Sequence, residues 1–354
     1  MQEKSKIKTI GIVGGGQLGR MICFAAHKMG YKTIIFCDKE NSPASFVTNK
    51  TIIANYDNKK ALAEFAQSSD IITFEFENIP YEAVEFLDKI TPVLPKPQIL
   101  KITQDRILEK TFLQNIGINV TDFAIIKNLD DLQKNVEKFG KSIIKTTTLG
   151  YDGKGQYTIN NQSEIGSIWQ NINGLSLILE KFCPFDLEIS TIVARSKSGQ
   201  IKTFAPVYNQ HKNSILDKTI YPAPISRNLQ NKAQDIACKI AKEIDLIGVL
   251  AVEFFVLEDD LLVNELAPRP HNSGHITMDL CLTSQFEQLI RSIVDINLGD
   301  VSFFAKGYMQ NLIGEDILNI EQYYQNPKAK IHLYDKSKIA IGRKMGHVNL
   351  IEKI

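Results

Sequence analysis

The chain has 354 residues, a length that suggests two or three domains, and its 44% apolar and 23% charged residues are typical of a folded protein. Forty-one lysine and arginine residues oppose 40 aspartate and glutamate residues, so the net charge of +1 offers no broad field to attract nucleic acid or an anionic membrane. No stretch approaches the ~20 apolar residues of a membrane span. The first residues lack the apolar core of a signal peptide, and five scattered cysteines favour free thiols, so we expect a cytoplasmic protein.

Strands and helices alternate along the first hundred residues. The apolar patterns predict strands at 8–13, 33–37, 52–54 and 71–76, and helices at 20–29 and 59–66. Such alternation builds a parallel sheet with helices on both faces. We therefore expect a Rossmann-like α/β domain at 1–98, ended by the proline-rich segment 92–97.

The rest of the chain divides into a mixed segment and a strand-rich segment. A single helix is predicted over 99–115, followed by strands at 123–126, 142–145 and 177–180, which gives a middle domain at 99–182. The last domain, 183–354, is predicted to be mostly strands, with helices near 229–244 and 283–297.

A glycine-rich turn follows the first strand and precedes the first helix. Gly14, Gly16 and Gly19 have the spacing of a dinucleotide-binding turn, and Asp38 lies where such a fold keeps its ribose-binding acid. A nicotinamide-dependent oxidoreductase is therefore one alternative. A plain strand-to-helix turn explains the glycines equally well.

A second glycine-rich segment lies between two lysines. Lys145 ends a predicted strand, and the loop Gly150-Tyr151-Asp152-Gly153-Lys154-Gly155 follows shortly after it. Glycines allow backbone N–H groups to surround phosphate oxygens, and lysines add positive charge. The Walker A pattern is absent from the sequence, so this is a different kind of phosphate loop, or else a solvated hairpin tip.

Two glutamates are predicted to face each other across a hairpin. With a three-residue loop at 258–260, Leu257 pairs with Leu261, Phe255 with Val263 and Glu253 with Glu265. Opposed carboxylates repel unless a cation lies between them, and Mg²⁺ prefers oxygen ligands. The hairpin therefore predicts a magnesium site.

Two further clusters are rich in groups that bind anions. One follows Glu265 and contains Arg269, His271, Asn272 and His275, without the spacing of a zinc site. The other is the basic, glycine-flanked segment 334–347, which a solvated surface would also explain.

Taken together, these motifs resemble the ATP-grasp enzymes, most closely the 5-(carboxyamino)imidazole ribonucleotide synthases of purine biosynthesis. The specific parts are the segments 150–156 and 264–275, and the resemblance extends from about residue 8 to about residue 350. It implies an α/β ATP-grasp fold with an N-terminal pre-ATP-grasp domain, in which Asp38 is not a nicotinamide contact. It also implies a homodimer.

The resemblance assigns roles residue by residue. It implies ATP contacts at Arg106, Lys145, Gly150, Tyr151, Asp152, Gly153, Lys154, Gly155, Gln156, Glu180, Lys181, Phe182, Cys183, Glu188, His211, Asn264 and Glu265. It implies ribonucleotide contacts at Gln17, Leu18, Glu75, Asn272, Lys336, Arg343 and Lys344. The implied catalytic residues are Asp152, Lys154, Arg269 and His271, and the implied Mg²⁺ ligands are Glu253 and Glu265.

The implied reaction is the ATP-dependent carboxylation of 5-aminoimidazole ribonucleotide by bicarbonate, through carboxyphosphate. Asp152 and His271 are both candidates to handle the proton of the amine. A related ATP-grasp enzyme that uses formate and glycinamide ribonucleotide shares most of these motifs and remains an alternative. A non-catalytic nucleotide-binding module is disfavoured by Lys145, Glu253 and Glu265.

Overall fold

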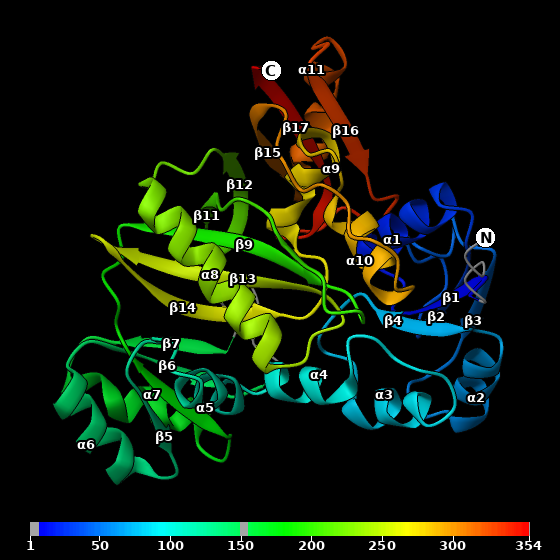
Figure 1. Cartoon of the computed structure of the whole chain (residues 1–354). Helices are drawn as coiled ribbons and strands as arrows, with labels where there is room; N and C mark the ends of the chain where they lie inside the picture. Colours follow the sequence, from blue (N-terminus) through cyan, green and yellow to red (C-terminus); the bar gives the residue numbers. More distant parts are fainter. Residues whose placement is uncertain (1–6, 149–154, 354) are drawn as a thin grey trace.

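The computed structural model describes residues 7–148 and 155–353, and within these residues the strands form three sheets (Figure 1). A four-stranded parallel sheet lies at the N-terminus, a four-stranded antiparallel sheet in the middle, and a nine-stranded antiparallel sheet in the C-terminal half. None of the helices in the described ranges is long and apolar enough to cross a membrane.

The N-terminal sheet has the predicted parallel arrangement, in the strand order β3-β2-β1-β4. Its elements are β1 (Thr9–Val13), α1 (Gln17–Lys28), β2 (Lys32–Cys37), β3 (Lys50–Ile53), α2 (Lys59–Gln67), β4 (Ile71–Phe74) and α3 (Tyr81–Asp88). Helices cover both faces of the sheet, so its central strands are almost wholly apolar, as parallel strands require. The proline-rich segment continues this sheet, because Val93 pairs with Ile72 of β4.

The single helix predicted over 99–115 is wrong, because two helices occupy this segment. They are α4 (Pro97–Gln104) and α5 (Arg106–Asn115). Asp105 between them has an extended backbone, with φ −119° and ψ 116°, and its carboxylate accepts hydrogen bonds from the N–H groups of Ile107 and Leu108. Aspartate is a strong N-cap residue, so it ends one helix and begins the next.

The middle sheet is antiparallel, in the order β5-β8-β6-β7. Its elements are β5 (Phe123–Ile126), α6 (Leu129–Phe139), β6 (Ser142–Thr146), β7 (Gln156–Ile159), α7 (Ile165–Ile172) and β8 (Leu177–Lys181), with one 3₁₀ turn at Gln162–Glu164. The helices α6 and α7 pack on the sheet through a core that includes Leu132, Ile144 and Leu179. This unit forms the lower left lobe of the molecule (Figure 1).

The large sheet has the order β14-β13-β9-β11-β12-β15-β17-β16, and β10 pairs with the C-terminal end of β9. Its strands are β9 (Leu187–Arg195), β10 (Ile201–Thr203), β11 (Val207–Lys212), β12 (Ile215–Tyr221), β13 (Gly248–Leu257), β14 (Asp260–Ala267), β15 (Lys306–Ile313), β16 (Ala329–Leu333) and β17 (Lys344–Lys353). Its helices are α8 (Arg227–Glu243), α9 (Thr277–Leu280), α10 (Gln285–Ile293) and α11 (Glu321–Tyr324), with 3₁₀ turns at Asn272–Ile276 and Gly314–Asn319.

Two helices cover opposite faces of the strands β9 and β13. Leu250 and Val252 of β13 share a core with α8, whereas the alternate residues Val249 and Ala251 share a core with α10. That second core also contains residues of α1, so it joins the N-terminal domain to the large sheet (Figure 1).

Candidate active site

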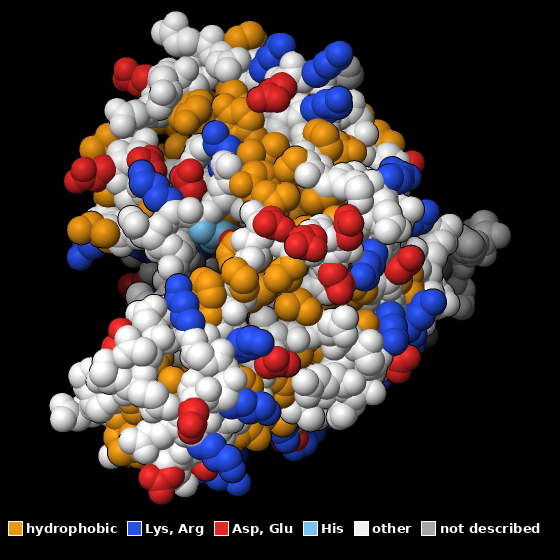
Figure 2. Space-filling view, turned by 90° about the vertical axis from the view of Figure 1, so that its left-hand side faces the viewer, with side chains coloured by type: hydrophobic (Ala, Val, Ile, Leu, Met, Phe, Trp, Pro, Cys, Tyr) orange, Lys and Arg blue, Asp and Glu red, His pale blue; other side chains and the backbone are white. Residues whose placement is uncertain are grey.

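A cavity of about 710 Å³ lies where the three sheets approach one another. Figure 2 shows the molecule hollowed between its upper and lower lobes. Fifteen of the residues expected from the sequence line the cavity: Gln17, Leu18, Glu75, Arg106, Lys145, Gln156, Glu188, His211, Glu253, Asn264, Glu265, Arg269, His271, Asn272 and Lys344. Segments from all three parts of the chain therefore contribute to one site.

Glu253 and Glu265 face each other across β13 and β14, as predicted. The rest of the predicted register is wrong, because Val256 pairs with Leu261 and Phe254 with Val263. The turn contains two residues instead of three, and a β-bulge at Asn264 brings the glutamates back into register. The bulge is the feature that keeps the two carboxylates opposed.

The carboxylate pair lies in a partly buried and strongly charged part of the cavity. Burial raises the pKa of Glu253 to about 8, and the negative charge of Glu265 contributes to the rise. Burial also raises the pKa of Glu265, although the positive charges of Arg106 and Lys145 oppose it. Two carboxylates that resist ionisation in the free protein provide the oxygen donors that a divalent cation prefers.

The donor set of the pair fits Mg²⁺ bound together with phosphate oxygens. Among the residues that the structure describes, no group of three or more His, Cys, Asp or Glu side chains could hold a metal ion. Mg²⁺ usually takes one or two carboxylates from a protein and completes its coordination with phosphates and water. Glu253 and Glu265 match that pattern.

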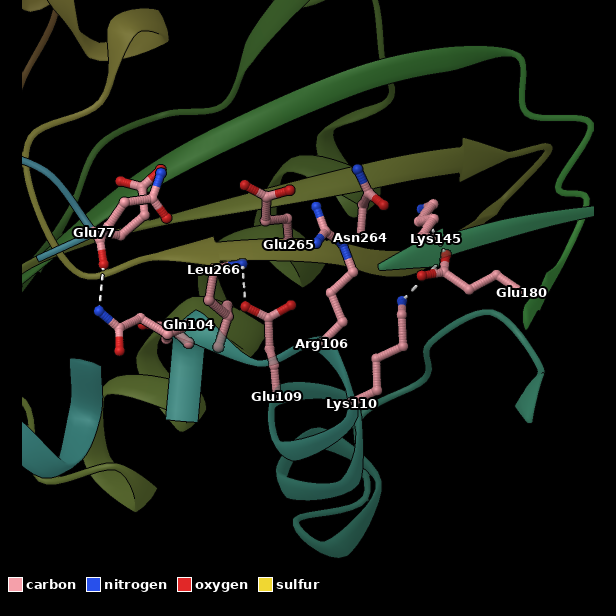
Figure 3. A pocket seen from close by; sticks show the side chains of 12 residues that line it. Glu77, Gln104, Arg106, Glu109, Lys110, Lys145, Glu180, Asn264, Glu265 and Leu266 are labelled. Atoms are coloured by element: carbon pink, nitrogen blue, oxygen red, sulfur yellow. Dashed lines mark hydrogen bonds and ion pairs between the residues drawn. The ribbon is translucent and has the colours of Figure 1, made fainter. Parts of the chain in front are cut away.

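A small pocket of about 40 Å³ beside the cavity contains a buried carboxylate between two lysines (Figure 3). The Glu180 Oε2 atom lies 2.9 Å from Lys145 Nζ and 3.6 Å from Lys110 Nζ. Burial alone would raise the pKa of Glu180, but the charges of the two lysines outweigh it and lower that pKa to about 2. The ion pair fixes the Lys145 ammonium at the cavity wall.

Two further α5 residues that line this pocket, Glu109 and Lys110, were not predicted from the sequence. Lys110 is buried, and Glu109 is buried with its Oε2 atom accepting a hydrogen bond from the Leu266 N–H at 3.0 Å. Burial and the charge of Glu265 raise the pKa of Glu109 well above its usual range. The available signal was spacing, because Arg106, Glu109 and Lys110 lie three and four residues apart and share one face of the helix.

The nucleotide contacts implied by the resemblance lie at the other side of the cavity. His211 forms an ion pair with Glu188. Burial would lower the pKa of His211, but the hydrogen bond and charge of Glu188 raise it. The rings of Phe185 and Phe255, which were not predicted from the sequence, line the cavity as a parallel stack with centroids 4.5 Å apart.

Three of the expected nucleotide contacts, Lys181, Phe182 and Cys183, lie outside the cavity lining. The N–H of Lys181 donates to the Asp122 carbonyl, and the N–H of Phe182 donates to the Lys141 carbonyl. Among the described residues, none accepts a hydrogen bond from the N–H of Cys183. The N–H groups of Lys181 and Phe182 are therefore already used within the middle domain.

The predicted phosphate loop is described only in part. Gly150, Tyr151, Asp152, Gly153 and Lys154 lie outside the described residues. Gly155 has a φ of +71°, which side-chain-bearing residues rarely adopt, and its carbonyl accepts a hydrogen bond from Thr146 at the end of β6. Gly155 is therefore hydrogen-bonded directly to the strand that carries Lys145.

The glycine turn at the start of α1 binds a carboxylate of its own chain. Glu75 accepts hydrogen bonds from the N–H groups of Gly16 at 2.8 Å and Gly19 at 3.2 Å. A side chain at Gly14 or Gly16 would collide with Glu75. The carboxylate occupies the N–H groups that a dinucleotide pyrophosphate would need, which argues against the nicotinamide alternative.

The segment after β14 places Arg269, His271 and Asn272 in the cavity. Arg269 forms an ion pair with Glu77, a residue that was not predicted from the sequence although it follows Glu75 by two positions. Burial and the charge of Arg269 lower the pKa of His271 well below its usual range. Both polar side-chain atoms of Asn272 are buried, and among the described residues neither has a hydrogen-bond partner.

The C-terminal basic cluster contributes one residue to the cavity lining. Lys344 lines the cavity, whereas Lys336 and Arg343 do not. The Lys336 Nζ donates to the Lys344 carbonyl at 2.6 Å, and Arg343 donates to the Lys338 carbonyl at 2.8 Å. Burial and the charge of Arg343 lower the pKa of Lys336 to about 8.

Comparisons with known proteins identify the family. Three family models match in succession: a ribonucleotide synthetase preATP-grasp domain at 7–104, an ATP-grasp domain at 111–286, and a phosphoribosylaminoimidazole carboxylase C-terminal domain at 307–353. The N5-carboxyaminoimidazole ribonucleotide synthase of Bacillus subtilis (strain 168) is 42% identical over 347 residues, which are 97% of this chain and 91% of that protein. The chain belongs to the family of N5-carboxyaminoimidazole ribonucleotide synthases.

A solved structure shares the fold of the chain, and another relative is much longer than the chain. The crystal structure of the Aspergillus clavatus enzyme with ADP and 5-aminoimidazole ribonucleotide has a TM-score of 0.93, 27% identity, and coverage of 99% of this chain and 95% of that one. A bifunctional purine synthesis protein of Dictyostelium discoideum is 43% identical over 96% of this chain, but the chain spans only 36% of its length.

Membership in this family confirms the predicted ATP-grasp fold with its pre-ATP-grasp domain. The chain is an ATP-grasp ligase of purine biosynthesis. The comparisons favour this function over the formate-dependent enzyme and the nicotinamide-dependent oxidoreductase.

Proposed function

We propose that the chain carboxylates 5-aminoimidazole ribonucleotide with bicarbonate, using ATP, to give 5-(carboxyamino)imidazole ribonucleotide. The observation that carries the proposal is the opposed pair Glu253 and Glu265, surrounded by Arg106, Lys145 and Arg269 in one cavity. Paired carboxylates and fixed cations are what transfer of a phosphoryl group from Mg-ATP requires. The names of the relatives supply the identity of the acceptor.

The ATP would lie between the middle and C-terminal parts of the cavity. Phe185 and Phe255 offer an apolar wall for the adenine, and the N–H of Cys183 is available to its ring nitrogens. Glu188 would take the ribose hydroxyls, with His211 and Asn264 beside the nucleotide. Lys145 and Arg106 would contact the phosphates, and the loop 150–156 would cover them.

Glu253 and Glu265 would hold Mg²⁺, which offsets the charge of the transferring phosphoryl group when bound. The fixed positive side chains of the site would also offset this negative charge. Lys145 is held by Glu180, so its charge is already in place before the reaction and costs no reorganisation. Preorganised charge of this kind stabilises a transition state more than a mobile side chain does.

The ribonucleotide would lie toward the N-terminal domain. Gln17, Leu18 and Glu75 line that side of the cavity, and Lys344 provides a cation for the phosphate group. The buried amide of Asn272 has polar atoms without partners among the described residues, which a bound polar ligand would satisfy. We place Lys336 and Arg343 as more distant cations in the same region.

The chemistry follows from the weakness of bicarbonate as an electrophile. A bicarbonate oxygen attacks the γ-phosphate of ATP, which gives carboxyphosphate and ADP. The ribonucleotide amine then attacks the carboxyl carbon directly, or captures released CO₂; phosphate departs and the amine loses a proton. Arg269 would stabilise the anionic carboxyl and phosphoryl oxygens, and the glycine loop with Asp152 and Lys154 would exclude water.

The decisive experiment measures ADP release and product formation with ATP, adding bicarbonate and the ribonucleotide separately and together. We expect ADP release to rise with the ribonucleotide, and a carboxylated product that depends on bicarbonate. Turnover with formate and glycinamide ribonucleotide instead would support the alternative ATP-grasp reaction. We also propose a cytoplasmic homodimer, which rests on the family resemblance and is tested by light scattering of the purified protein.

A further inference from the structure

The ring of His271 lies between Glu253 and the side chain of Ser273. The His271 Nε2 atom is 3.3 Å from Glu253 Oε1, and the Nδ1 atom is 2.8 Å from Ser273 Oγ. The backbone N–H of Ser273 also donates to Nδ1, at 3.4 Å. A backbone N–H can only donate, so Nδ1 must be the unprotonated nitrogen and the ring proton must be on Nε2.

A row of buried polar side chains continues from Ser273 into the large sheet. The Ser190 hydroxyl donates to Ser273 Oγ at 2.7 Å, and the Asn209 amide donates to Ser190 Oγ at 2.9 Å. The Thr219 hydroxyl donates to Asn209 Oδ1 at 3.0 Å. Each of these four residues is at most 4% exposed, so each hydrogen bond replaces a lost contact with water.

The row has one direction. The Asn209 oxygen is occupied by Thr219, so its amide nitrogen must donate to Ser190. The Ser190 hydroxyl therefore donates its hydrogen bond to Ser273 Oγ. The Ser273 hydroxyl in turn donates to His271 Nδ1. The row and the backbone N–H of Ser273 thus assign the same tautomer to the ring.

The sheet explains why these residues meet. Glu253 pairs directly with Ser190 across β13 and β9, so both side chains point to the same face. Asn209 pairs with Thr219 across β11 and β12. It also pairs with Glu188, two residues before Ser190, across β11 and β9, so its side chain lies on the same face. A side-chain row that includes one of the opposed glutamates therefore extends over four strands.

The backbone of His271 is fixed as firmly as its ring. The buried Gln285 of α10 accepts a hydrogen bond from the His271 N–H at 2.8 Å and donates one to the His271 carbonyl at 2.7 Å. A side chain at Gly274 would collide with Gln285. The ring therefore has little freedom to turn and expose Nδ1.

We infer that Ser273, Ser190 and Asn209 are positioning residues that hold His271 as the Nε2–H tautomer, so that His271 donates a hydrogen bond in the site. In this role His271 is a donor toward Glu253 and the groups bound there, and it does not accept the proton of the ribonucleotide amine. The inference rests on the proposed function for its kinetic test, but the tautomer itself is a property of the free protein.

The tautomer can be measured directly. In protein labelled with ¹⁵N-histidine, we expect His271 to show an unprotonated Nδ1 and a protonated Nε2 near neutral pH, assigned by comparison with His271→Gln. In Ser273→Ala we expect protonated Nδ1 to become populated, because the main donor is lost. A protonated Nδ1 in the unmodified protein would overturn the inference, whatever reaction the enzyme catalyses.

Kinetics distinguish a donor from a base. Glutamine places an amide N–H near the position of Nε2–H, so His271→Gln should retain at least about a tenth of the turnover, whereas His271→Ala should lose about 10²-fold or more. If His271 accepts the amine proton, both variants should be equally impaired. Mg-ADP binding, followed by calorimetry, should change little in His271→Gln.

A double-mutant cycle tests whether the row acts through His271. Ser273→Ala and Ser190→Ala should each lower turnover about 10–100-fold, as is usual for residues that orient a ligand or catalytic group, and add nothing in the His271→Gln background. Additive effects would show a merely structural role. Ser292→Ala is the matched control, because it removes a buried hydroxyl that bonds a helix carbonyl in α10, and it should leave turnover unchanged.

Discussion

Replacing Glu265 by glutamine should stabilise the metal-free protein at alkaline pH while weakening its response to magnesium. The pKa of Glu253 is about 8 in the folded protein against 4.5 for a free side chain, and Glu265 is one of its causes after burial. A carboxyl group that holds its proton more tightly when folded contributes stability that is fully present below pH 4.5. That stability is lost as the pH rises through about 8.

The stability lost through the raised pKa of Glu253 has an upper bound. The span from pH 4.5 to about 8, at 1.36 kcal/mol per pH unit, corresponds to at most ~5 kcal/mol of lost stability. The Glu253 side chain is 23% exposed, so water in the cavity reduces this value. Burial is the largest cause of the raised pKa of Glu253, so removing the charge of Glu265 reverses only part of the loss. Glu265→Gln should therefore restore about 0.5–1 kcal/mol of stability, as expected for one pair of like charges opposed across two strands.

The assay is thermal unfolding of the metal-free protein between pH 5 and pH 8, followed by titration with Mg-ADP. We expect Glu265→Gln to raise the melting temperature by about 1–3 °C at pH 8 and to have no effect at pH 5. The stabilisation by Mg-ADP should be smaller than in the unmodified protein. Glu64→Gln, which removes an exposed ion pair with Lys50, is the control. A lower melting temperature at pH 8 combined with an unchanged magnesium response would refute the assignment.

Three further results are expected. Lys145→Ala should lose about 10²–10³-fold in turnover, because its ammonium group is fixed by Glu180; near-normal turnover would remove Lys145 from the phosphate contacts. Lys344→Ala should raise the half-saturating ribonucleotide concentration more than Arg343→Ala, since Lys344 lines the cavity and Arg343 contacts a carbonyl outside it; equal titrations would contradict this placement. Burial lowers the pKa of His347 well below its usual range, so the unfolded chain takes up this proton first below about pH 6.5, and stability present above that pH is lost below it. We therefore measure the free energy of unfolding in urea from pH 7.5 to pH 5, which should fall by up to ~1.4 kcal/mol less per pH unit in His347→Gln than in the unmodified protein. Parallel curves of this free energy against pH would count against the prediction.

Local patterns in the sequence were enough to predict the parallel sheet of the N-terminal domain and several of the later strands and helices. Period-two and helical apolar patterns identified the strands of the N-terminal domain and the long helix α8, because these patterns follow from which face of an element is buried. The opposed glutamates were also predictable, since pairing in a hairpin depends on residues close in the chain. The break at Asp105 was missed, because the apolar pattern continues across it.

The side-chain partners that give the site its chemistry depended on the tertiary structure. Glu75 reaches Gly16 across 59 residues, Lys145 and Glu180 are 35 residues apart, and Arg269 reaches Glu77 across 192. The row from Thr219 to His271 joins three strands and a loop that are separate in the sequence. Periodicity records which face of an element is buried, but a hydrogen bond between distant residues exists only after the sheets have packed, so its partners and its direction leave no local pattern in the chain.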